Sequence, residues 1–227
     1  MNIENIKKQF PIFNNKVHNN DLVYLDSANS SQKPQVVVDR IYDFYTKEFS
    51  NVGRSVHYLA VAATNLYEET RSLVQKYINA KDPNEIVFTK GATEAINLVA
   101  NTFGQKFLKE GDEIILTELE HHSNYVPWHY LRRSKGVQIK FAEINSEGEI
   151  SLESIEKLIT SKTKMIAITH LSNVTGAILP IKEITQLAHS KNIPILIDGC
   201  QGAPHLKLDM QEIGCDFYAI SCHKMYG

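Results

Sequence analysis

The stretch Ile193-Pro194-Ile195-Leu196-Ile197-Asp198 decides the fold class of this chain. Its apolar residues follow one another without the polar alternation of a strand that has one solvated face. A continuous apolar run of this length indicates a strand buried on both faces, as in a sheet covered by helices. Similar runs occupy 113–117 and 164–169. The core is therefore expected to contain several buried strands that lie side by side.

Expected strands and helices alternate along most of the chain. We expect helices at 35–49, 60–79, 93–107, 124–134, 152–159 and 181–191, and strands at 22–25, 85–89, 113–117, 137–144, 164–169, 193–198 and 216–221. This alternation predicts an α/β protein, a three-layer α/β/α sandwich with a mostly parallel sheet. Residues 1–30 form an N-terminal segment that begins with a short amphipathic helix, and residues 31–227 form one large domain.

Composition excludes several classes of protein. The 227 residues are 43% apolar and 22% charged, with a net charge of -2, as in an ordinary soluble domain. Lys and Arg are scattered, so no nucleic-acid surface is expected. The apolar runs have the length of strands and are too short to cross a membrane. Three cysteines without paired spacing argue against a disulfide framework and fit a reducing cytoplasm.

Polar residues gather directly after the expected strands. In open α/β sheets, ligands bind at the carboxyl ends of the strands. The residues at these ends carry hydroxyl, imidazole, amide and carboxylate groups, whereas the opposite ends read as ordinary turns. The polar positions are 91–93, 120–122, 170–173, 198–201 and 221–224. The asymmetry predicts a polar site at one edge of the sheet.

A glycine turn at Lys90-Gly91-Ala92-Thr93 leads from an expected strand into an expected helix. The free N–H groups and the dipole of a helix N-terminus favour an anion, usually a phosphate. Thr93 would add a hydroxyl, although it also suits a simple N-cap. Ser221 and His223 are further candidates for binding a phosphate.

Asp198 and Lys224 suggest a site for pyridoxal phosphate (PLP). A carboxylate at the end of an apolar strand needs a partner or a role, and it would pair with the protonated pyridine nitrogen. Gln201 would reach the ring hydroxyl. Lys224 follows the apolar run 217–220 and is the candidate Schiff-base lysine. The alternatives are a capping aspartate and an exposed surface lysine.

His121 and His122 directly follow an expected strand. One imidazole is suited to stacking on an aromatic cofactor and to moving protons. A metal site built from Glu120, His121, His122 and His170 is the alternative. Adjacent histidines on an extended chain point in opposite directions, so we expect no metal.

With these residues assembled, the chain resembles the class V aminotransferase group of fold-type I PLP enzymes, and within it the SUF-type cysteine desulfurases. The resemblance spans nearly the whole chain in the order of the family. Its most specific element is Asp198…Gln201 followed by Ser221-Cys222-His223-Lys224. The other matching stretches are 24–28, 32–34, 91–100, 120–124, 126–128 and 169–176.

The resemblance implies a role for each site residue. Lys224 would bind the cofactor covalently and move protons, and His121 would stack over its ring. Asp198 would hold the pyridine nitrogen and Gln201 the phenolic oxygen. The phosphate would be held by Thr93, Ser221 and His223, and Ala92 would also bind the cofactor. Asn173 would lie near the ring hydroxyl and the substrate carboxylate.

The implied reaction converts L-cysteine to L-alanine. A cysteine thiolate takes the sulfur as a persulfide and passes it to an acceptor protein of the SUF system for iron–sulfur cluster assembly. A homodimer is implied as well. The chain departs from the family at Gly53, at Cys200 and Cys222, where Ala or Gly is common, and at Asn29, near the substrate entrance.

Family members continue well past the PLP lysine. We therefore expect this chain to be an N-terminal fragment that lacks the small domain, the nucleophilic cysteine and the substrate-binding arginine, and to be inactive on its own. Another class V aminotransferase or lyase, such as a kynureninase-like enzyme or a selenocysteine lyase, is the alternative, as is an inert fragment.

Overall fold

The structure, a computed structural model, describes residues 2–227, which form two compact units. The sheet unit comprises Ile78–Lys81 and Val87–Ser221. The helical unit comprises Met1–Tyr77, of which residues 2 onward are described, together with Asp82–Ile86 and Cys222–Gly227.

The sheet unit contains five strands in the order β4-β3-β5-β6-β7. Every neighbouring pair is parallel, which confirms the expected α/β class. The strands are β3 (Glu113–Thr117), β4 (Gln138–Ala142), β5 (Thr163–Thr169), β6 (Ile195–Asp198) and β7 (Phe217–Ala219). The apolar stretch at 193–198 therefore supplies β6, which lies between β5 and β7.

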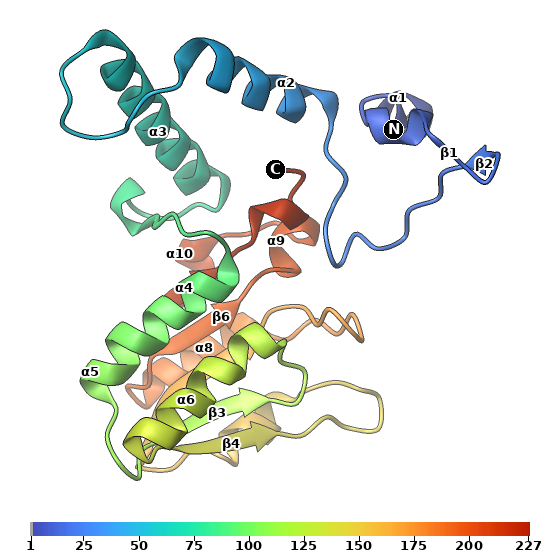
Figure 1. Cartoon of the computed structure of the whole chain (residues 1–227). Helices are drawn as coiled ribbons and strands as arrows, with labels where there is room; N and C mark the ends of the chain where they lie inside the picture. The colour runs from blue at the N-terminus through green and yellow to red at the C-terminus, as the bar shows by residue number, and fades with distance from the viewer. Residues whose placement is uncertain (1) are drawn as a thin grey trace. The chain divides into compact units, whose positions relative to one another are not determined.

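Helices cover both faces of this sheet (Figure 1). Along β3, Ile114 and Leu116 pack in one core cluster with Trp128, whereas Ile115 packs in the other cluster with Ile184. The first cluster lies under α4 (Ala92–Val99) and α6 (Val126–Lys135), and the second lies under α7 (Leu152–Glu156) and α8 (Ile181–Ser190). Burial on both faces explains why the strands read as continuous apolar runs.

The remaining elements of the sheet unit are short. A π-helical segment and a further turn extend α4 to residue 107, so the helical region agrees with the helix expected at 93–107. Between β6 and β7 the sequence predicts one helix-loop unit, and the structure has two short helices there. These elements are η4 (Ala100–Gly104), α5 (Gln105–Phe107), η5 (His122–Asn124), α9 (Gly202–His205) and α10 (Met210–Ile213).

Two expected strands are wrong. Residues 86–89, which follow the 3-10 turn η3 (Pro83–Glu85), belong to no strand of the structure, and neither do residues 22–25. The described N-terminal region instead has the two-residue strands β1 (Lys16–Val17) and β2 (Asn20–Asp21), which pair with each other. A strand requires a neighbour for its backbone groups, and local sequence does not indicate whether a neighbour is present.

The helical unit contains α1 (Ile3–Lys7), α2 (Gln35–Asp43), the π-helical η2 (Phe44–Glu48), α3 (Tyr58–Tyr77) and η6 (Cys222–Lys224). Apolar residues at helical spacing within 35–49 are largely exposed, with Val38 at 44%, Ile41 at 54% and Phe49 at 59%. The spacing of apolar residues identifies the apolar face of this helix, but it does not show whether another surface covers that face. Within residues 2–227, no helix is long and apolar enough to cross a membrane.

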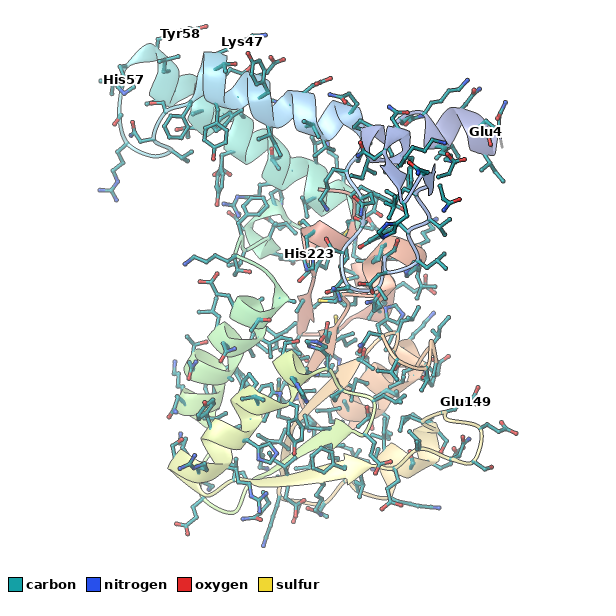
Figure 2. The ribbon with its side chains drawn as sticks, turned by 45° about the vertical axis from the view of Figure 1, so that its right-hand side comes forward. Glu4, Lys47, His57, Tyr58, Glu149 and His223 are labelled. Carbon is teal, nitrogen blue, oxygen red and sulfur yellow. The ribbon has the colours of Figure 1, made fainter. Side chains whose placement is uncertain are left out.

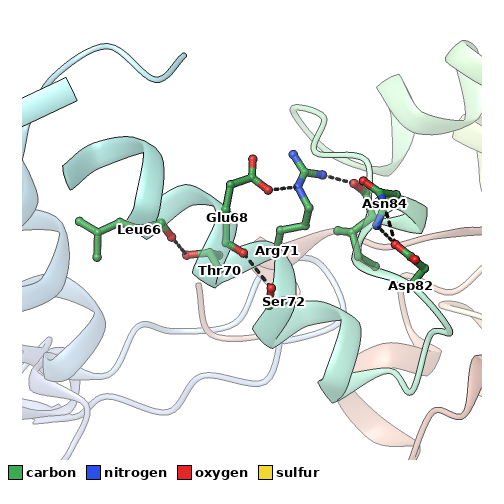
Figure 3. Close-up of polar contacts among 8 residues, drawn as sticks. Leu66, Glu68, Thr70, Arg71, Ser72, Asp82 and Asn84 are labelled. Atoms are coloured by element: carbon green, nitrogen blue, oxygen red, sulfur yellow. Dashed lines mark hydrogen bonds and ion pairs between the residues drawn. The ribbon is translucent and has the colours of Figure 1, made fainter. Parts of the chain in front are cut away.

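Polar contacts join α3 to the segment 82–86 of the same unit (Figure 3). Arg71 pairs with Glu68 at 2.9 Å and donates to the backbone carbonyl of Ile86. Asp82 caps the following turn, because its Oδ1 accepts from the backbone N and from Nδ2 of Asn84, each at 2.8 Å. Side-chain hydrogen bonds therefore connect this segment to the helix.

The turn after β6 passes directly over Tyr218 of β7. A Cβ atom added at Gly199 would lie 1.9 Å from Cε1 of Tyr218, and one added at Gly202 would lie 2.6 Å from Nδ1 of His170. Contacts this short are not tolerated in a packed core. Glycine at both positions therefore allows the turn that carries Asp198 to sit against β7.

We expect Gly199→Ala to lower the free energy of unfolding by about 1–3 kcal/mol, because the new methyl group overlaps the Tyr218 ring. Urea unfolding of Gly199→Ala, Tyr218→Ala and the double variant measures this effect. In the Tyr218→Ala background the methyl group has room, so the loss caused by Gly199→Ala should largely vanish. Equal losses in both backgrounds would refute the packing argument.

Candidate active site at the carboxyl edge of the sheet

The register of the sheet places the expected site residues of the sheet unit at one edge. Asp198 is the last residue of β6 and lies between Thr169 of β5 and Ala219 of β7. The backbone continues this alignment, because the N–H of Gly199 donates to the carbonyl of Ala219 at 2.9 Å. Ser221 follows Ala219 by two residues. Asp198 at the end of β6 and Ser221 just after β7 therefore lie at the same edge of the sheet.

The N-terminus of α4 meets Ser221 at this edge. Gly91 is the N-cap, with φ at 150°, and the N–H of Ala92 donates to Oγ of Ser221 at 3.0 Å. A Cβ atom at Gly91 would lie 3.6 Å from that oxygen. Thr93 is exposed in the first turn and is not the cap, so the capping alternative for its hydroxyl is wrong. The hydroxyl of Ser221 and the first turn of α4 together offer donors to an anion.

Asp198 is 3% exposed, and its Oδ1 accepts from the backbone N of Cys200 at 3.0 Å. Within residues 2–227, Oδ2 of Asp198 has no hydrogen-bond partner, and this oxygen is not completely enclosed by protein atoms. Gln201 is the N-cap residue of α9 and is 4% exposed. The turn thus presents a carboxylate oxygen that a cationic or N–H group of a ligand can reach.

His121 lies after β3 and is the N-cap residue of η5. Its Nδ1 faces Ser123, whose backbone N lies at 3.1 Å and whose Oγ lies at 2.7 Å. Because the backbone N–H can only donate, Nδ1 is the acceptor and the proton of the neutral ring lies on Nε2. The His122 ring centroid is 6.2 Å from that of His121. In the part of the chain that the structure describes, no three metal-ligating side chains cluster.

Asn173 lies at the tip of a tight turn after β5. Ser172 accepts from the backbone N of Val174 and of Thr175, each at 3.3 Å, and Leu171 bridges to Ile178. The turn is internally bonded, so it holds Asn173 exposed. This placement leaves its amide available to a ligand.

His223 and Lys224 lie in η6 of the helical unit. Lys224 follows Ser221 by three residues (224 minus 221). Partial burial lowers the pKa of His223, and the positive charges of Lys224 and Lys33 lower it further. The phosphate role expected for His223 and the Schiff-base role of Lys224 remain predictions.

Glu120 is a residue that sequence reasoning considered only as a metal ligand. Its Oε1 accepts from Oγ1 of Thr117 at 2.6 Å and from the backbone N of Thr169 at 2.9 Å. Its Oε2 accepts from Nδ2 of Asn124 at 2.7 Å, and Oδ1 of Asn124 accepts from Trp128 at 3.1 Å. Glu120 therefore ties the end of β3 to η5 and β5, and so supports the turn that carries His121.

Burial raises the pKa of Glu120 to about 8, against the lowering effect of its three hydrogen bonds, and the charge of Asp198 adds to the increase. Enclosing a carboxylate disfavours its charged form, which is why the shift is upward. A partly buried pair joins Nδ1 of His170 to the hydroxyl of Tyr218 at 2.7 Å. Burial lowers the pKa of His170 to about 4, so this imidazole is neutral at pH 7.

The sequence contains a partial signal for Glu120. Thr117, Glu120 and Asn124 lie at spacings of three and four residues around a strand end, which suits a side chain that folds back onto its own turn. The His170–Tyr218 pair has no such signal, because its partners are 48 residues apart.

Comparison with known proteins gives consistent results. The Aminotransferase class-V family matches residues 23–227. A probable cysteine desulfurase of Halalkalibacterium halodurans is 48% identical over 227 residues, which is 100% of this chain and 56% of the relative. A cysteine desulfurase of Serratia proteamaculans is 44% identical over 225 residues, 99% of this chain and 55% of the relative. The chain thus spans about half the length of the curated relatives it matches.

A solved structure with the same fold is the cysteine desulfurase CsdA of Escherichia coli. It aligns with a TM-score of 0.89 and 36% identity, and the alignment covers 100% of this chain and 56% of that one. The expected fold of a PLP-dependent transferase large domain is thereby confirmed.

We expect Glu120→Gln to change how stability depends on pH. Between pH 4.5 and about 8 the folded chain keeps a proton on Glu120 that the unfolded chain has released, so Glu120 destabilises the fold as pH rises through this window. Urea unfolding at pH 5.5 and 8.5 should show the free-energy advantage of the unmodified protein over Glu120→Gln shrinking by on the order of 1–3 kcal/mol.

The matched control is Glu147→Gln, because Glu147 is exposed. This variant should keep the pH dependence of the unmodified protein. If the free energy of unfolding of Glu120→Gln changed with pH in the same way as that of the unmodified protein, the raised pKa of Glu120 would be disproved.

Proposed function

Because this chain belongs to the aminotransferase class-V family, we propose that it forms the PLP-binding part of a SUF-type cysteine desulfurase. Its reaction converts L-cysteine to L-alanine and passes the sulfur as a persulfide to an acceptor protein for iron–sulfur cluster assembly. One observation carries the proposal: Asp198, Gln201, Ser221 and the start of α4 gather at one edge, and Lys224 follows along the chain. The resemblance extends the proposal to a homodimer in the cytoplasm.

The residues at the edge fit the phosphate of this cofactor. The first turn of α4 has backbone N–H groups that no intrahelical bond uses, and Ser221 stands beside them at 3.0 Å from the N of Ala92. Thr93 is exposed on the same turn. We assign these groups, with His223, to the phosphate, since a helix N-terminus with hydroxyl neighbours stabilises a dianion.

The residues also fit the ring. Asp198 offers the unbonded Oδ2 to a protonated ring nitrogen, and burial strengthens such a charged hydrogen bond. Gln201, on the same turn, is assigned to the phenolic oxygen. We assign His121 to the ring face and Asn173, which is exposed after β5, to the ring hydroxyl and the substrate carboxylate.

When bound, PLP supplies an electron sink that stabilises negative charge on a substrate amino acid. The protein contributes proton transfer and orientation. The amine of Lys224 takes and returns a proton at its Nζ, and His121 donates from Nε2 because Ser123 occupies Nδ1. Cys215 is unsuited to nucleophilic attack, because burial raises the pKa of its thiol to about 12.

We expect the protein reconstituted with PLP, after removal of free PLP, to show the absorption band of a Schiff base that Lys224→Ala abolishes, because Lys224 is the proposed attachment point. Borohydride reduction followed by peptide mass spectrometry should locate the cofactor on Lys224. Lys162→Ala, at an exposed lysine of the sheet unit, is the matched control and should keep the band. A band that survives in Lys224→Ala would exclude this lysine as the attachment site.

We expect L-cysteine to change this band and L-kynurenine to leave it unaltered, since the proposed substrate is a small thiol amino acid. Spectral titration of the reconstituted protein measures both responses. His121→Ala should weaken the response to L-cysteine, because it removes the proposed proton donor. A response to L-kynurenine alone would favour the kynureninase-like alternative instead.

A further inference from the structure

The backbone carbonyl of His223 receives four hydrogen bonds from a segment about 190 residues earlier in the chain. Nζ of Lys33 donates at 2.8 Å, the Oγ of Ser31 at 3.0 Å, the N of Ser31 at 3.1 Å and the Oγ of Ser30 at 3.3 Å. Donors and acceptor belong to the helical unit, whose C-terminal segment holds His223 (Figure 2). The carbonyl belongs to the peptide group that joins His223 to Lys224.

This number of donors exceeds the ordinary need of a carbonyl. A carbonyl oxygen has two lone pairs and usually accepts one or two hydrogen bonds. Here one of the four donors is an ammonium, and charge-assisted hydrogen bonds are about twice as strong as neutral ones. Ser31 is 6% exposed, so its bonds are shielded from water. The peptide before Lys224 is thereby fixed in position and in orientation.

Ser31 also fixes the chain on the other side of Lys224. Its Oγ accepts from the backbone N of Tyr226 at 2.8 Å. The Tyr226 ring stacks edge-on against Phe10, with ring centroids 5.9 Å apart. Lys224 therefore lies between two backbone groups that the same serine holds, one residue before it and two residues after it.

Lys33 has few other partners for its charge. Nζ donates to the carbonyl of Ser31 at 3.0 Å and to that of His223, and it makes no ion pair with a carboxylate in residues 2–227. Partial burial lowers its pKa. Lys33 is half-buried, and its ammonium donates to two backbone carbonyl oxygens where a lysine more often pairs with a carboxylate. A lysine used in this way, next to the proposed cofactor lysine, is better explained by a role at that lysine than by general stability.

We propose that Lys33 and Ser31 are positioning residues for Lys224, forming a clamp that directs its side chain by holding the 223–224 peptide. The proposal rests on the proposed function, in which Lys224 binds the cofactor. The clamp aligns the amine before the cofactor arrives, so less conformational freedom is lost on attachment. Lys33 itself touches neither substrate nor cofactor in this assignment.

The experiment compares Lys33→Met, Lys33→Arg, Ser31→Ala and the control Lys8→Met, which changes an exposed lysine of the same unit. Each protein is incubated with PLP and reduced with borohydride, and peptide mass spectrometry measures the rate of attachment at Lys224. Hydrogen exchange at the amide of Tyr226 is measured without cofactor, and thermal unfolding reports global stability.

We expect Lys33→Met to slow attachment at Lys224 about tenfold, the effect of losing one hydrogen bond to a charged group. Lys33→Arg should restore most of the rate, because guanidinium also donates to a carbonyl. Ser31→Ala should accelerate hydrogen exchange at Tyr226, and Lys8→Met should match the unmodified protein throughout.

The clamp is overturned if Lys33→Met attaches cofactor as fast as the unmodified protein, or if the Met and Arg variants lose attachment and thermal stability equally. An unmodified protein that attaches no cofactor at Lys224 contradicts the proposed function instead. In that case hydrogen exchange still decides about the clamp, because unchanged exchange at Tyr226 in Ser31→Ala rejects it.

Discussion

The pairing of β6 with β7 is the interaction on which the arrangement of the site depends. Asp198 lies opposite Ala219, and the N–H of Gly199 donates to the carbonyl of Ala219 at 2.9 Å. This register sets where the chain leaves β7, and so brings Ser221 to the first turn of α4. A shift by one residue would turn every side chain of β7 to the opposite face. The Tyr218 ring would then leave the space that Gly199 provides for it. Packing and register therefore specify the same arrangement.

Electrostatics at this edge follow from burial. Two carboxylates, Asp198 and Glu120, approach the same region, and burial raises the pKa of Glu120 to about 8. Holding Glu120 neutral at pH 7 limits the negative charge that the edge must accommodate. His170 acts in the other direction, because its pKa is lowered to about 4 and the unfolded chain takes up a proton first as pH falls below 6.5. Stability contributed by His170 is lost as pH falls from 6.5 to about 4, and stability contributed by Glu120 is lost as pH rises from 4.5 to about 8. The two effects oppose each other where these windows overlap, between pH 4.5 and 6.5, so together they favour a fold that is most stable there and less stable above pH 6.5.

The sequence predicted the sheet and the edge well, because both follow from local patterns. Buried strands such as β5 and β6 appear as continuous apolar runs, and the residues after them showed the polar edge. The run at 85–89 has the same pattern, but residues 86–89 find no neighbouring strand within the described chain. Glu120 was undervalued because its burial depends on Thr169, which is 49 residues away. The contact of Lys33 with His223 spans 190 residues, and no periodicity reports such a distance.

The helical unit holds the backbone around Lys224 mainly by polar contacts, and its scarcity of buried apolar side chains explains why. Ala60, Ala63 and Ile86 are its buried apolar residues in the described chain, and each of the two alanines offers little apolar area. Apolar packing is non-directional and would leave a small segment free to rotate. Hydrogen bonds depend steeply on angle, so four donors on one carbonyl restrict the orientation of its peptide plane. A lysine that must present its amine in one direction gains more from such bonds than from added apolar contact. The neutral donors of Ser30 and Ser31 keep this restraint across the pH range, and the charge of Lys33 strengthens it.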